Sequence, residues 1–250
     1  MAQDADLIRR AQDLADRCER TQTVTHSSFL TPAEQYTIKQ RCAGNGVSNL
    51  RFGGGYSDAE RQLACFVPDW FPEEEDPFEE ILACVKITAG FGTPGHRDYL
   101  GSVLGLGIKR EWLGDILIFG DTAYIVCLKP VNETLLSELN HVSRYGVRCE
   151  AAQLSDIPVP EKKVKVVTFT VQSPRFDAVV GAVFGISRSH AAKLIAGGAA
   201  SLNYAECMKN DAAVKEGDII SVRGYGKVKM LSPSGQSRKG RTFLSAERYL

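Results

Sequence analysis

The segment from Arg175 to Met230 constrains the fold most strongly, because its apolar residues change from helical to strand spacing. Spacings of three and four residues predict one helix that ends at Gly185. Ser187 is predicted to cap a second helix, which ends at Gly197-Gly198. The predicted inner faces of the two helices comprise Phe176, Val179, Val180, Val183 and Phe184 in the first, and Ala191, Leu194 and Ile195 in the second.

Two strands are predicted after these helices, each with one apolar and one cationic face. Side chains alternate across a strand, so Ile220 and Val222 point away from Arg223. Val228 and Met230 likewise point away from Lys227 and Lys229.

Charge is unevenly distributed along the chain, although the formal net charge of all 250 residues is zero. Residues 1–150 contain 15 Lys and Arg against 22 Asp and Glu, whereas residues 175–250 contain 12 against 6. A basic third on an acidic body predicts an anionic partner for that third, and nucleic acid is the usual one.

Cysteine spacing and hydropathy exclude several classes of protein. No two of the seven cysteines lie closer than 19 positions, which excludes a local CxxC zinc or redox pair. Four of them lie in apolar runs and are predicted to be reduced core thiols. The first 20 residues contain no apolar signal core, and no apolar run approaches the roughly 20 residues of a membrane span. We expect a soluble cytoplasmic protein without a membrane partner, metal or cofactor.

Residues 1–75 are predicted to form a mixed N-terminal domain. Leu7, Ala11, Leu14, Ala15 and Cys18 recur at helical spacing. Thr31-Pro32-Ala33-Glu34 has the pattern of a capping box and predicts a helix that ends at Gly44-Asn45-Gly46. Strand-like runs at 50–52 and 63–67 flank a Gly53-Gly54-Gly55-Tyr56 turn, which lacks the spacing of a phosphate loop. We expect the acidic stretch at 68–80 to be a boundary, and the Glu60-Arg61 pair to make local ion pairs or to leave an exposed arginine.

The pattern of apolar runs and helix starts in residues 76–160 predicts a domain with the element order β-α-β-β-α-β. Its strands are expected at 81–87, 116–119, 124–128 and 147–151, with a hairpin turn at Gly120-Asp121. One helix is expected to start at Thr93-Pro94, and the other at Asn132 as the cap, continuing to Val142. This order is typical of a ferredoxin-like, RRM-like sandwich. No strand carries the RRM aromatic signature, so the fold alone does not predict base stacking. The fold class of the whole chain is therefore α+β.

The C-terminal segment resembles the S4 RNA-binding domain. This module also occurs in a ribosomal small-subunit protein, in RNA pseudouridine synthases and in heat-shock ribosome-rescue proteins. The resemblance covers residues 175–250. The chain departs from it at two places: Ala199-Ala200 stands where the family often has a cation or Val, and Tyr204 stands where it usually has Gly. The matching residues are Arg175-x-Asp177, Ser187-Arg188-Ser189, Ala191 with Ile195, Gly198 before Leu202-Asn203, and Glu216-Gly217-Asp218-Ile219-Ile220.

The whole chain is similar to the YlmH-type S4 proteins of bacteria. This resemblance implies a helical N-terminal domain, an RRM-like middle domain and a C-terminal S4 domain. It also implies a role in rescuing stalled large ribosomal subunits, with contacts to 23S rRNA and P-site tRNA, and a link to cell division. The matching residues are Phe29-Leu30-x-Pro32, Gly54-Gly55-Tyr56 with Ala59-Glu60-Arg61, 96–101, 104–110, and Gly114-Asp115-Ile116.

The predicted RNA-binding residues fall into two groups. In the C-terminal group, the start of a helix beside Arg188 suits a phosphate oxygen. Asp177 there either fixes the geometry of Arg175 or caps a helix. For the second group, ordinary helix packing with solvated charges is the alternative to RNA binding. The C-terminal group is Arg175, Ser187, Arg188, Ser189, Lys193, Asn203, Arg223, Lys227 and Lys229, and the second is His96, Arg97, Lys109 and Arg110.

We do not expect catalysis, because the four histidines are scattered and none belongs to a recognisable nucleophile motif. The expected partners are the ribosome, rRNA of its large subunit, and tRNA, without a small-molecule substrate. Two alternatives stay open. The chain could be an RNA-modifying enzyme related to pseudouridine synthases, or a cell-division adaptor that docks through its acidic N-terminal domain.

Overall fold

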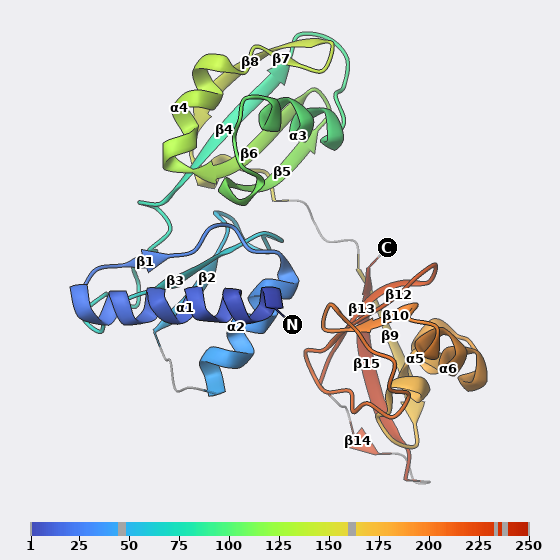
Figure 1. Cartoon of the computed structure of the whole chain (residues 1–250). Helices are drawn as coiled ribbons and strands as arrows, with labels where there is room; N and C mark the ends of the chain where they lie inside the picture. The colour runs from blue at the N-terminus through green and yellow to red at the C-terminus, as the bar shows by residue number, and fades with distance from the viewer. Residues whose placement is uncertain (1, 45–48, 160–163, 233–234, 237–239, 250) are drawn as a thin grey trace. The chain divides into compact units, whose positions relative to one another are not determined.

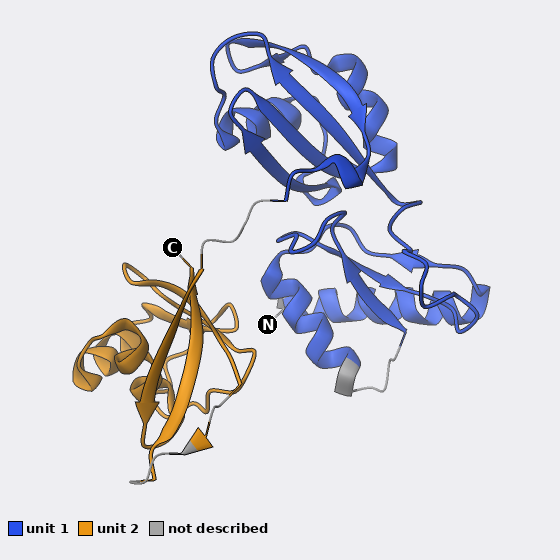
Figure 2. Ribbon diagram, turned by 180° about the vertical axis from the view of Figure 1, so that it is seen from behind, with its two compact units in different colours: residues 1–159 blue, residues 160–250 orange. Residues whose placement is uncertain are grey.

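The structure is a computed structural model that describes residues 2–44, 49–159, 164–232, 235–236 and 240–249 (Figure 1). The chain divides into two compact units, residues 1–159 and 160–250, and each combines helices with antiparallel sheets (Figure 2). None of the helices in the described residues is both long and apolar enough to span a membrane.

The first unit begins with two helices on a small sheet. Helices α1 (Ala2–Thr21) and α2 (Pro32–Gly44) pack on a sheet of order β1-β3-β2, formed by Thr25–His26, Leu63–Phe66 and Leu50–Gly53. The predicted capping box is confirmed, since the Thr31 N–H donates to Glu34 Oε2 at 2.7 Å and the Glu34 N–H to Thr31 Oγ1 at 3.4 Å. The predicted end of α2 at Asn45-Gly46 lies outside the described residues.

The second part of this unit has the predicted β-α-β-β-α-β order. Its sheet runs β5-β6-β4-β8-β7, and all neighbours are antiparallel. Residues of α3 and α4 pack on one face, where Val85, Ile87 and Ile125 are buried. The elements are β4 (Leu82–Ala89), α3 (His96–Gly105), η1 (Arg110–Trp112), β5 (Leu113–Phe119), β6 (Thr122–Leu128), α4 (Lys129–Glu138), β7 (His141–Val142), β8 (Tyr145–Ala152) and η2 (Leu154–Asp156).

The starts of both helices differ from the predictions. Helix α3 begins at His96 rather than at Thr93-Pro94, because Asp98 Oδ2 accepts the Gly95 N–H at 2.8 Å and fixes the first turn. Asn132 does not cap α4, which begins at Lys129 with proline in its first turn, where no N–H is needed. Val142 lies in β7 rather than on α4, since the helix ends at Glu138.

The other face of the five-stranded sheet is covered by the N-terminal part of the same unit. Phe29, Leu63 and Phe78 pack in one cluster with Tyr124 and Val126 of β6. The approach is close, because a Cβ atom on Gly114 would lie 2.8 Å from the Phe29 ring. The stretch predicted as a solvated boundary thus has exposed acidic residues at 73–76 but places Phe78 in this core.

In the residues that the structure describes, the second unit consists of two short helices on one face of a seven-stranded sheet. The strand order is β11-β10-β12-β13-β15-β14, and β9 pairs along β15 from Val164↔Tyr249 to Val171↔Thr242. Strand β9 therefore extends this unit beyond the predicted domain, whose expected start is residue 175. The elements are β9 (Val164–Val171), α5 (Phe176–Phe184), α6 (Arg188–Ala196), β10 (Ala200–Leu202), β11 (Ala205–Glu206), β12 (Ile219–Val222), β13 (Gly226–Met230), β14 (Gly235–Gln236) and β15 (Thr242–Tyr249).

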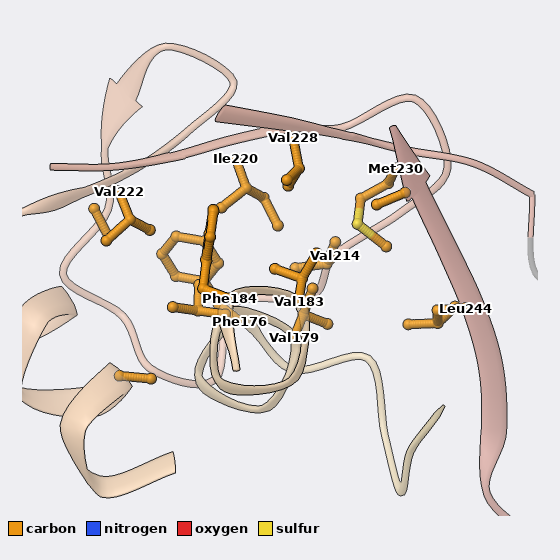
Figure 3. Packing of buried hydrophobic residues seen from close by; sticks show 14 of the residues in the cluster. Phe176, Val179, Val183, Phe184, Val214, Ile220, Val222, Val228, Met230 and Leu244 are labelled. Atoms are coloured by element: carbon orange, nitrogen blue, oxygen red, sulfur yellow. The ribbon is translucent and has the colours of Figure 1, made fainter. Parts of the chain in front are cut away.

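The core of the second unit lies between these helices and the sheet. Figure 3 shows Phe176 and Val183 among side chains from the strands, such as Ile220, Val228 and Met230. The predicted alternation is confirmed, and Gly185 ends α5 in the left-handed conformation (φ 68°) as the sequence indicates. The opposite face of the sheet stays accessible at several positions, among them Val166 (58% exposed), Thr168, Lys229 and Phe243.

Candidate nucleic-acid interface

A buried carboxylate organises the start of α6. Asp177 lies in the first turn of α5 and is 5% exposed. Arg188 Nε donates to its Oδ2 at 3.0 Å and Arg188 Nη2 lies 2.9 Å from the same atom, while Arg175 Nε lies 3.4 Å from Oδ1. The side chains of the two arginines remain 60% and 43% exposed. One carboxylate therefore holds two guanidinium groups at the surface.

The arginines keep this carboxylate ionised. Burial alone raises the pKa of Asp177, but the hydrogen bonds and charges of Arg188 and Arg175 outweigh burial and hold that pKa below its ordinary value of 3.8. Asp177 lies inside α5, whose N-cap residue is Arg175, so Asp177 is not the cap of this helix. Of the two roles that the sequence left open, the geometry favours Asp177 as the group that positions the arginines.

Exposed hydroxyls and a lysine adjoin Arg188. Ser187 caps α6 by accepting the His190 N–H at 3.2 Å, and Ser189 Oγ lies 3.1 Å from Ser187 Oγ. Lys193 is exposed one turn further along the helix. Such a helix start with exposed donors and cations suits an anionic oxygen. We call Arg175, Ser187, Arg188, Ser189 and Lys193 the α6 surface.

The remaining predicted cations do not all join this surface. Lys227 and Lys229 alternate along β13 with Val228 and Met230, which are buried under the helices, so both lysines project from the opposite face of the sheet. Lys227 Nζ lies 5.0 Å from the ring centroid of Tyr249. Arg223 is exposed just after β12. The structure thus divides the predicted C-terminal track between two faces.

Asn203 has a local structural role. It lies in the hairpin between β10 and β11 with φ 51°, where Asn is tolerated better than most residues. Its Nδ2 donates to Asp218 Oδ1 at 2.8 Å, and its Oδ1 accepts the Ile219 N–H at 2.9 Å. These two bonds use both polar atoms of the amide group to join the hairpin to β12.

The second predicted group is spread over both ends of α3. His96 and Arg97 are exposed in its first turn, whereas Lys109 and Arg110 follow its end. Lys109 Nζ lies 5.5 Å from the ring centroid of Trp112. Arg110 Nη1 instead donates to the carbonyls of Leu113 at 2.8 Å and Gly114 at 3.1 Å. Arg110 is therefore engaged inside the protein, unlike the other three.

Sequence reasoning missed the brace that joins the two parts of the first unit. Asp115, in an irregular part of β5, accepts the Tyr56 hydroxyl at 2.7 Å and the backbone N–H groups of Glu60 at 2.6 Å and Arg61 at 3.1 Å. Arg61 donates to the carbonyls of Leu113 and Phe29, both at 3.0 Å. These bonds give the Glu60-Arg61 pair and the Gly114-Asp115-Ile116 pattern a structural role.

The cysteines are consistent with core packing. Cys65, Cys84 and Cys127 are buried, and burial raises the pKa of each thiol to about 12, so the thiols stay protonated. Within the described parts of the chain, no group of three His, Cys, Asp or Glu side chains could hold a metal ion.

Comparison with known proteins identifies the family. A family model described as "Putative RNA-binding domain in YlmH" matches residues 72–156. The ribosome-associated protein quality control protein P2 of Bacillus subtilis (strain 168) is 31% identical over 223 residues, which is 89% of this chain and 86% of that protein. The solved structure of the cell division protein YlmH from Streptococcus pneumoniae has a similar fold, with a TM-score of 0.54, 20% identity, and coverage of 62% of this chain and 94% of that one. The identity to the Bacillus subtilis protein over most of both sequences shows that the chain belongs to the YlmH family.

Proposed function

We propose that this protein binds RNA on the ribosome and acts, without catalysis, in the quality control of stalled translation. The name of the Bacillus subtilis relative and the description of the matching family model support this role. The observation that carries the proposal is the α6 surface, where buried Asp177 orients two exposed arginines beside the start of a helix.

Phosphate oxygens are the ligand that fits the α6 surface best. Guanidinium groups bind them through paired hydrogen bonds, and a helix start adds backbone N–H groups of the same polarity. The carboxylate of Asp177 fixes the arginines in advance, so less side-chain entropy is lost on binding. Binding through such contacts should weaken as salt rises, because each phosphate contact releases counterions.

The order of the elements supports a more specific proposal for each domain. We infer that residues 175–250, together with β9, form an S4 domain that contacts large-subunit rRNA, and that the middle domain is RRM-like. Its sheet face is covered by Phe29, Leu63 and Phe78, so tRNA or rRNA would meet this domain at its exposed ends, such as His96 and Arg97. A cytoplasmic location agrees with a ribosomal partner.

The test is binding of the full chain to purified large ribosomal subunits at several salt concentrations. Reversing the charge of Arg188 would also leave Asp177 short of a partner, so Ser189→Glu/Lys193→Glu is the better variant. We expect it to reduce the affinity at least tenfold and the salt slope by about 1. Thr168→Glu/Lys165→Glu makes the same charge change at exposed positions of β9, outside the predicted RNA-binding residues, and should bind nearly normally.

Equal loss in both variants would show that binding follows net charge rather than the α6 surface. Thermal unfolding of each variant excludes loss of structure as the cause. The alternative role as a cell-division adaptor, which the name of the Streptococcus pneumoniae protein favours, is tested by deleting residues 160–250. An adaptor that acts through the first unit should keep its division activity without them.

A further inference from the structure

An exposed aromatic ring stands at one end of the middle sheet. Phe91, in the loop between β4 and α3, is 65% exposed. Its ring meets the Tyr145 ring edge-on, with centroids 5.5 Å apart. The Arg144 guanidinium lies 5.2 Å from the Tyr145 centroid, and Arg144 Nη2 donates to the Tyr145 hydroxyl at 3.1 Å. We call Phe91, Arg144 and Tyr145 the loop cluster.

The backbone around this cluster is fixed by specific contacts. Gly92 has φ 73°, and a Cβ atom there would lie 2.4 Å from Tyr145 Cε1, so a larger residue does not fit. The Gly90 N–H donates to the Gly146 carbonyl at 3.0 Å. The Ser143 N–H donates to Ser102 Oγ of α3 at 3.0 Å. These contacts hold the loop against β8 and the β7–β8 turn against α3.

The charges around the loop cluster favour an anionic partner. Arg144 belongs to the cluster itself, and exposed His96 and Arg97 begin the helix that follows the loop. Asp98, the acidic residue in that first turn, uses its carboxylate to accept the Gly95 N–H. A single exposed apolar side chain needs no explanation. An exposed ring beside a stacked guanidinium, by contrast, is the combination that binds the faces of unpaired bases.

Because the N-terminal part covers one face of the middle sheet, a contact with a base is more accessible at this loop than on that face. In RRM domains, aromatic side chains on the open sheet face stack the bases. Here Tyr124 of β6 is 8% exposed on the corresponding face and packs with Phe78 and Val126. Phe91 at the loop end is accessible instead.

We propose that Phe91 stacks on an unpaired base of the bound RNA, while Arg144 and Arg97 contact the phosphates beside that base. This inference rests on the proposed function and adds to it the class of RNA element that the middle domain takes, an unpaired nucleotide rather than a duplex. It also assigns to Tyr145 and Gly92 the task of holding Phe91 in its exposed position.

Substitutions at Phe91 in the full chain separate stacking from other kinds of contact. Binding to purified large ribosomal subunits should weaken about tenfold for Phe91→Ser and for Phe91→Leu, since both lack a π-face. Phe91→Tyr should bind like the wild type. The salt slope should stay unchanged in all three, because no phosphate contact is lost. Trp70→Ser, which removes another exposed aromatic ring (62% exposed), is the matched control and should have no effect.

The outcomes distinguish this inference from the proposed function. If Phe91→Leu binds normally while Phe91→Ser does not, the loop docks into an apolar pocket of a protein, and the stacking inference is wrong. If all Phe91 variants bind normally while Ser189→Glu/Lys193→Glu does not, the proposed function holds and the inference fails.

A second probe covers the case in which the wild type does not bind large subunits, which would contradict the proposed function. It compares single-stranded oligoadenylate of about 12 nucleotides with a fully paired RNA duplex of the same length. A preference for the single strand that depends on Phe91 would still support stacking, and the absence of such a preference would overturn it.

Discussion

The two large sheets of the molecule differ in what covers them. The five-stranded sheet has α3 and α4 on one face and the N-terminal part on the other, so β6 is buried from Ala123 to Cys127. Among the described residues, the seven-stranded sheet has helices on one face only, and β13 alternates between buried valine or methionine and more exposed lysine. A continuous apolar strand and an alternating strand thus mark a doubly covered and a singly covered sheet.

This difference shows why the order of elements does not by itself locate a binding surface. The middle domain has the β-α-β-β-α-β order, yet the N-terminal part occupies much of the face that such a sheet could offer to RNA. Exposed groups remain at its loops and helix ends. In the second unit the open sheet face carries Lys227 and Lys229, while the α6 surface lies on the helical side.

A charge introduced on the covered sheet, compared with one on the open sheet, gives the largest expected effect. Val126→Asp places an unpaired carboxylate at a position with 0% exposure between the sheet and the N-terminal part, and should destabilise the first unit by more than about 4 kcal/mol. Thr168→Asp, on the exposed face of the seven-stranded sheet, should cost less than about 1 kcal/mol. Urea unfolding followed by circular dichroism measures both, and similar losses would contradict the comparison.

The brace between the parts of the first unit should have the next largest effect. Asp115→Ala removes the acceptor of three hydrogen bonds and should lower the free energy of unfolding by about 3 kcal/mol. Both tryptophans, Trp70 and Trp112, lie in this unit, so tryptophan fluorescence follows its unfolding separately. Glu133→Ala, an exposed position on α4, serves as the control. A loss below about 1 kcal/mol would show that apolar packing alone covers the sheet.

The smallest effect concerns the second unit and depends on pH. The folded pKa of Asp177 lies below 3.8, so its ion pairs stabilise the folded state at neutral pH and are lost as pH falls through that lowered pKa. Asp177→Asn should therefore cost about 2 kcal/mol at pH 7 and progressively less below pH 3.8. Circular dichroism reports both units and tryptophan fluorescence only the first, which isolates the effect. A cost that does not change with pH would indicate a packing role.

Local signals in the sequence predicted much of the secondary structure. The capping box at Thr31, the cap at Ser187 and the glycine after α5 each depend on a few neighbouring residues, and the structure confirms them. The same logic failed at Asn132, because a good capping residue was present but Pro130 set an earlier start. Propensity identifies possible caps, and competition between neighbours decides which one is used.

Long-range pairing could not be predicted in the same way. The brace around Asp115 joins residues more than 50 positions apart, and no local pattern identifies its partners. The strand pair β9 and β15 has the same difficulty, since its register depends on two distant segments. Among the candidate site residues, types and helix positions were predictable, but the division of the cations between two sheet faces required the packed structure.

The pairing of β9 with β15 has a consequence for how the protein is made. Strand β9 is the first element of the second unit to leave the ribosome, yet its antiparallel partner along the whole strand is the last. During synthesis, the emerging β9 must remain an unpaired strand edge while α5, α6 and the short strands follow it. The unit can complete its sheet only after β15 has emerged, so the RNA binding proposed for this unit should begin late in its own translation.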